Sequence, residues 1–149
     1  MNIEIDQSGK IENTEHDTVI AFSNGVSSTI TLSGKDKRTL QAFFRAAGKP
    51  RVFVVKVFAL LIFILLRPYL KNIRCISIDR EYPGWEHLIK DYLLREIRRL
   101  EPTFESHAIT FVLVGKKSRA HHAALAVTHK KCKADMKVGA SDILRYVVK

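Results

Sequence analysis

Two aspartates stand at the ends of short segments that alternate like β-strands. Asp6 closes the segment IEID, and Asp79 closes the segment IRCISID. A single aspartate at a strand end is commonly a turn residue that bonds its own backbone. If these two strands are neighbours in one sheet, however, the two carboxylates come close enough to share a divalent cation. Carboxylate oxygens suit Mg²⁺ or Mn²⁺, which can activate water and stabilise the transition state of phosphodiester chemistry.

A basic segment near the C-terminus could supply binding groups for a polyanion. Residues 115–139 contain a single acid, Asp135, among the cations Lys116, Lys117, Arg119, Lys130, Lys131, Lys133 and Lys137. The whole chain has 25 Lys and Arg against 15 Asp and Glu, a net charge of +10. Such an excess favours nucleic acid, bound through its phosphates without reading of sequence. The alternative is a solvated basic surface loop without a dedicated partner.

One stretch is strongly apolar and contains a single charge. Residues 52–66 are apolar except for Lys56, and basic residues flank both ends of the stretch. A membrane-spanning helix needs about 20 apolar residues and tolerates a central lysine poorly. We therefore expect a core helix that packs against a sheet and no membrane partner. A peripheral membrane protein that uses this stretch is the last-ranked alternative.

The remaining patterns order the elements that must position these groups. Period-two alternation and turn residues predict strands at 3–6, 18–22, 28–32, 73–79 and 109–114. Helical periodicity predicts helices at 35–47, 52–66, 85–100 and 141–148. The expected fold class is α/β, a five-stranded mixed sheet of order β-β-β-α-β-α-β-α with helices on both faces and the first helical region split in two. The 149 residues form one domain.

This order, with its acids, resembles the ribonuclease H-like superfamily across the whole chain. "IEIDQSGK" is similar to the family's first strand and "ISIDREYPG" to its fourth, while Asp142 opens the last helix. The resemblance implies that Asp6, Asp79 and Asp142 bind Mg²⁺ or Mn²⁺ for phosphodiester cleavage or transfer. It also implies that a histidine of the basic segment helps a proton or product to leave, and His121, His122 and His129 are equal candidates.

The sequence departs from the family at the helix carboxylate. Lys56 lies about where that acid belongs, and residues 37–78 contain no Asp or Glu. Either Asp36 reaches the site from the preceding helix, or Lys56 takes the acid's place. In the second case Lys56 contacts the scissile phosphate or leaves a one-metal or inactive site. A further alternative is that Lys56 extends to the surface or pairs with Asp6 or Asp79 to neutralise them.

Two functions follow as hypotheses. The first is a nucleic-acid-binding, metal-dependent nuclease that uses Asp6, Asp79 and Asp142 with Lys56 beside them. The second is a non-catalytic nucleic-acid-binding or complex-assembly module of the same fold, in which Lys56 neutralises the acids. Because the first residues show no secretory pattern and the two cysteines are expected to be reduced, we expect a cytoplasmic protein.

Overall fold

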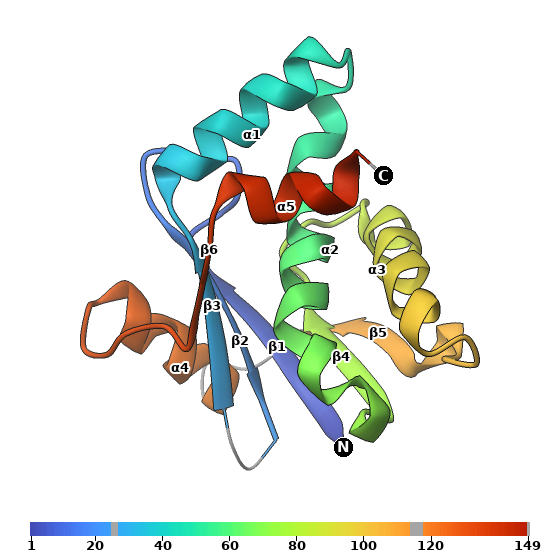
Figure 1. Ribbon diagram of the computed structural model, residues 1–149. Coiled ribbons are helices and arrows are strands. Elements are labelled where there is room, and N and C mark those ends of the chain that lie inside the picture. The colour runs from blue at the N-terminus through green and yellow to red at the C-terminus, as the bar shows by residue number, and fades with distance from the viewer. Residues whose placement is uncertain (25–26, 114–117, 149) are drawn as a thin grey trace.

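Three N-terminal strands form an antiparallel meander at the centre of a mixed sheet (Figure 1). The computed structural model describes residues 1–24, 27–113 and 118–148. Strand β1 (Asn2–Ser8) pairs with β2 (Thr18–Ser23), and β2 pairs with β3 (Ser27–Leu32). Strands β4 (Cys75–Asp79) and β5 (Ile109–Val112) extend the sheet in parallel beyond β1. The α/β class and the mixed sheet expected from the sequence are confirmed.

Among the described residues the sheet has six strands, in the order β5-β4-β1-β2-β3-β6, where the sequence predicted five. The additional strand, β6 (Met136–Val138), lies inside the basic segment and pairs in parallel with β3. Three residues are too few to show a period of two, so the sequence pattern could not reveal this strand. Its place depends on the exposed edge of β3, which is a tertiary feature.

Within the part of the chain that the structure describes, five α-helices pack around the sheet: α1 (Gly34–Ala46), α2 (Phe53–Leu66), α3 (Glu86–Leu100), α4 (Arg119–Thr128) and α5 (Ala140–Val147). Short 3₁₀ turns precede α2 (Pro50–Val52), follow it (Arg67–Asn72) and precede β5 (Ser106–Ala108). Helix α4 also lies in the basic segment, so two helices follow β5 where the sequence predicted one. Figure 1 shows α4 apart from the other helices.

The helices cover both faces of the sheet, as expected. Ile20 and Phe22 of β2 belong to the main core, which also includes most of α2. Their neighbours Val19 and Ala21 point the other way and pack against α4. Because successive side chains of a strand alternate between faces, one strand serves both layers.

Helix α2 is the centre of the main core. Three of its residues, Val54, Lys56 and Ile64, are half-buried, and the others are buried. This burial matches the core helix that the sequence predicts. The longer helical segment Pro50–Asn72 is also long and apolar enough to cross a membrane by length and composition alone, and 61% of its most apolar window is buried.

A buried lysine fixes the loop between β1 and β2. The side chain of Lys37 is 0% exposed, and its ammonium donates to the carbonyls of Lys10 (3.1 Å) and Asn13 (2.7 Å) and to the hydroxyl of Thr18 (2.9 Å). Burial lowers the pKa of Lys37 to about 8, against the opposing charges of Asp17 and Glu12. The Lys37 ammonium thus fixes the backbone of the loop that follows β1.

We expect Lys37 to give stability a distinctive dependence on pH. Between pH 8 and 10 the folded protein has lost the Lys37 proton while the unfolded chain, with a pKa near 10.5, still binds it. The unfolded state then binds more protons, so the free energy of unfolding rises with pH, by at most about 1.4 kcal/mol per pH unit. Urea unfolding of the wild type and Lys37→Met between pH 7.5 and 9.5 measures this slope. A difference between them that stays constant with pH contradicts the assignment.

Candidate metal centre

The parallel pairing of β1 with β4 brings the two strand-end aspartates together. In this ladder Ile5 lies opposite Ile78, so Asp6 and Asp79 are the next residues along each strand. Ile5 and Ile78 are buried in the main core, and alternation turns the aspartates to the opposite face. The sequence-based expectation that these two carboxylates come close is confirmed.

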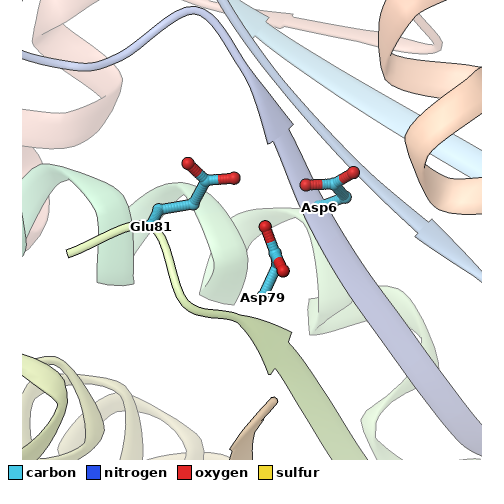
Figure 2. Close-up of side chains that lie close together, drawn as sticks. All are labelled: Asp6, Asp79 and Glu81. Atoms are coloured by element: carbon cyan, nitrogen blue, oxygen red, sulfur yellow. The ribbon is translucent and has the colours of Figure 1, made fainter. Parts of the chain in front are cut away.

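A third carboxyl group, that of Glu81, joins them from the segment after β4 (Figure 2). One oxygen from each of Asp6, Asp79 and Glu81 lies within 4.8 Å of the other two. Three carboxylates converging at this separation could hold a metal ion. Glu81 was not predicted as a site residue from the sequence. Its spacing of two residues from Asp79 was the available signal, because a chain that turns just after a strand can return a side chain to the strand's end.

Asp6 is the most buried of the three, with 3% of its surface exposed. One carboxylate oxygen accepts from the backbone N–H of Gln7 at 2.8 Å, and the other lies 2.9 Å from Nδ1 of His121. Burial raises the pKa of Asp6, and the nearby charge of Asp79 adds to this, while the two hydrogen bonds oppose it. A carboxylate can accept about four hydrogen bonds, so both oxygens retain capacity for a cation.

Glu81 lies between a carboxyl group and a lysine. Burial and a hydrogen bond with the Asp79 side chain raise the pKa of Glu81 to about 8, although Lys10 opposes the shift. The Lys10 ammonium lies 3.2 Å from Glu81 Oε2 and 4.8 Å from the centre of the Tyr82 ring. A proton on Glu81 at neutral pH thus lets three carboxyl groups lie together, and a divalent cation bound here would displace that proton.

Small residues of α4 allow His121 to reach Asp6. Ser118 caps the helix by accepting from the N–H of Ala120 at 3.1 Å. Ala120 and Ala124, one turn apart, are buried against Val19 and Ala21 of β2, so the helix lies close to the sheet. The alanine spacing was visible in the sequence, but the strand surface that receives it was not.

Of the three candidate histidines, the structure brings only His121 to the acids. The ring of His122 packs edge-on against that of His121, with centroids 5.8 Å apart. His129 is the C-cap residue of α4, at the other end of the helix. The sequence left the three histidines equal because the position of each one relative to α4 depends on where that helix begins and ends.

Asp142 lies away from the acidic cluster, which corrects its expected position. It follows β6, three strand spacings or roughly 14 Å from β1 across the sheet. Its carboxylate accepts from the N–H of Gly139 at 2.8 Å at the start of α5, while Asp36 accepts from the N–H of Ala140 at 3.1 Å. Both acids cap this helix. The expectation failed because α4, and not α5, is the helix that packs beside Asp6.

Lys56 is also placed elsewhere than expected. Its ammonium lies 4.8 Å from the centre of the Tyr92 ring of α3. Helix α2 covers the face of the sheet that carries Ile5 and Ile78, whereas Asp6 and Asp79 point to the opposite face. The sheet therefore separates Lys56 from the acids, and Lys10 is the lysine that pairs with the cluster.

The described cations of the basic segment lie around α4 and β6. Arg119 begins α4, Lys130, Lys131 and Lys133 follow its C-terminal end, and Lys137 is on β6; all five are exposed. Lys116 and Lys117 lie outside the described residues. The structure thus places these cations at both ends of the helix that carries His121 to Asp6 and on the strand that follows.

Comparison with known proteins gives no family for this chain. No family model, no curated protein and no solved structure matches it.

Proposed function

We propose that this protein is a divalent-metal-dependent phosphodiesterase of ribonuclease H-like type that acts on nucleic acid. The observation that carries the proposal is the convergence of Asp6, Asp79 and Glu81, whose oxygens lie within 4.8 Å of one another beside paired strands. The strand-helix order agrees with the resemblance seen in the sequence, with β6 and α4 as additions. The net charge of +10 favours a polyanionic substrate.

The residues around the cluster have separate roles in this proposal. Asp6, Asp79 and Glu81 would hold Mg²⁺ or Mn²⁺, which supplies Lewis acidity and an activated water when bound. Lys10, paired with Glu81, would supply a positive charge beside a non-bridging phosphate oxygen of the substrate. Asp6 orients the His121 ring through Nδ1, which leaves Nε2 as the ring nitrogen to take up or give a proton. The exposed cations of α4 and the following turn bind the backbone phosphates.

One observation favours a second candidate, a nucleic-acid-binding module without catalysis. Lys10 already pairs with Glu81, and Glu81 has a pKa of about 8, so the cluster carries less negative charge than its three carboxyl groups suggest. In this candidate Lys10 has the neutralising role that the sequence analysis gave to Lys56. Metal binding and cleavage distinguish the two candidates, whereas nucleic-acid binding is common to both.

We expect Mn²⁺ to bind at the cluster in one-to-one stoichiometry. Asp79→Asn and Glu81→Gln each remove one charged ligand while keeping the shape, so each should weaken binding at least about tenfold. Asp142→Asn is the matched control, because Asn can still accept from Gly139 and the residue lies outside the cluster. Calorimetric titration measures all three. Equal weakening by Asp142→Asn, or no saturable binding by the wild type, contradicts the site.

We expect nucleic-acid binding to depend steeply on salt and to use the turn after α4. Replacing Lys130, Lys131 and Lys133 with Gln should lower affinity and reduce the slope of log K against log salt by roughly 2–3, if each contacts one phosphate. A control with Lys35, Arg45 and Lys71 changed to Gln removes the same charge from exposed positions elsewhere. Fluorescence anisotropy in the presence of EDTA gives both slopes. Identical effects of the two triple variants would exclude a localised interface.

We expect cleavage of nucleic acid that requires Mg²⁺ or Mn²⁺ and the cluster acids. Single-stranded, hybrid and branched substrates are incubated with wild type, Asp79→Asn, Lys10→Met and Lys56→Met. Asp79→Asn should abolish cleavage and Lys10→Met should reduce it, whereas Lys56→Met should leave it unchanged because the sheet separates Lys56 from the acids. Binding without cleavage of any substrate, at saturating metal, would favour the non-catalytic module.

A further inference from the structure

A cavity lies on the opposite side of the sheet from the acids, lined by residues of α1, α2, α3 and α5 and of the segment before α2. It has a volume of about 560 Å³. Its apolar wall is formed by Phe43, Phe44, Val52 and Val147. This volume is in the range of pockets that bind small molecules in other proteins.

Two ammonium groups interrupt the apolar lining. Lys49 and Lys56 both line the cavity, together with Tyr92. Lys56 is half-buried, and its ammonium lies over the face of the Tyr92 ring, 4.8 Å from the ring centre. Lys49 is exposed at the rim, so the two lysines bring positive charge to the wall and the mouth of the cavity.

The surrounding charges are mainly positive. Arg95 lies 5.8 Å from the centre of the same Tyr92 ring. Glu96 is the acid whose charge acts on Lys56, and its buried carboxylate also lies 3.6 Å from Arg99 Nε. Burial lowers the pKa of Lys56, and the charges of Arg95 and Lys49 lower it further, while Glu96 opposes them. An anion in the cavity would relieve this repulsion.

We propose that this cavity binds a small amphipathic carboxylate, with its carboxylate at Lys56 and Lys49 and its hydrocarbon body against Phe43, Phe44, Val52 and Val147. The apolar walls favour a hydrocarbon chain because its surface is buried against them, and the two ammonium groups favour a negatively charged carboxylate. An anionic lipid of a bilayer could offer similar chemistry, with its phosphate in place of the carboxylate. The cavity has the volume of a small-molecule site, so the free acid is the form that fits.

The test uses decanoate below its micelle concentration as the probe and calorimetric titration of the full chain. Decanoate should bind saturably with one-to-one stoichiometry. Acetate, which lacks the body, and decyltrimethylammonium, which reverses the charge, should bind at least about tenfold more weakly. Equal binding of decyltrimethylammonium, or binding only to phosphatidylglycerol vesicles and not to decanoate, overturns the proposal.

Variants locate the site. Lys56→Met keeps the length of the side chain and removes its charge, so it should weaken decanoate binding about tenfold or more, whereas Lys56→Arg should retain it. Lys35→Met is the matched control at an exposed position of α1. Ala47→Trp, at an exposed position in the cavity wall, should abolish binding by filling the space while Lys56 is intact. Unchanged affinity in both Lys56→Met and Ala47→Trp contradicts the assignment.

This inference is independent of the proposed nuclease function. Asp79→Asn, which should abolish metal-dependent cleavage, should bind decanoate as the wild type does, because the sheet separates the two sites. Loss of decanoate binding in Asp79→Asn with the fold intact, judged by circular dichroism, would show that the cavity is not a separate site.

Discussion

The parallel ladder between β1 and β4 is the constraint on which the rest of the site depends. It sets Ile5 opposite Ile78, so that the residues that follow, Asp6 and Asp79, turn together to the face away from α2. A shift of the register by one residue would send one aspartate into the apolar core. The apolar partners thus enforce the register, because burying two isoleucines on α2 is favourable and burying an unpaired carboxylate there is not.

The two faces of the sheet carry different groups beside this ladder. One face carries α2 and the main core, and beyond it the cavity with Lys49 and Lys56. The other face receives α4 through alanines, and this close approach brings His121 to the buried Asp6. Lys37 adds a third element of order, since it holds the loop whose residue Lys10 pairs with Glu81. The hydrogen bonds of the buried Lys37 to the loop backbone therefore help to position the exposed Lys10.

Sequence reasoning located most elements but not the full set of site residues. The strands that carry Asp6 and Asp79 were predictable, because isoleucines at a spacing of two followed by an acid mark a strand and its end. Asp142 was placed wrongly, since the family resemblance counts positions along the chain and takes no account of the inserted α4 and β6. Lys56 was placed wrongly because the acids turn to the face of the sheet away from α2. Glu81 and Lys10 were missed because both lie in turns, where local pattern does not give side-chain direction.

The sequence by itself determined the α/β class, the amphipathic and core helices, the basic character and the pair of strand-end aspartates, because each depends on local composition and periodicity. Only the tertiary structure decided which residues meet. The pairing of β6 with β3, the packing of α4 on β2 and the turn after β4 join residues far apart in the chain. These contacts depend on complementary surfaces and not on any one segment's pattern. That is why the lysine of the apolar helix was expected beside the acids, while Lys10 is the lysine found there.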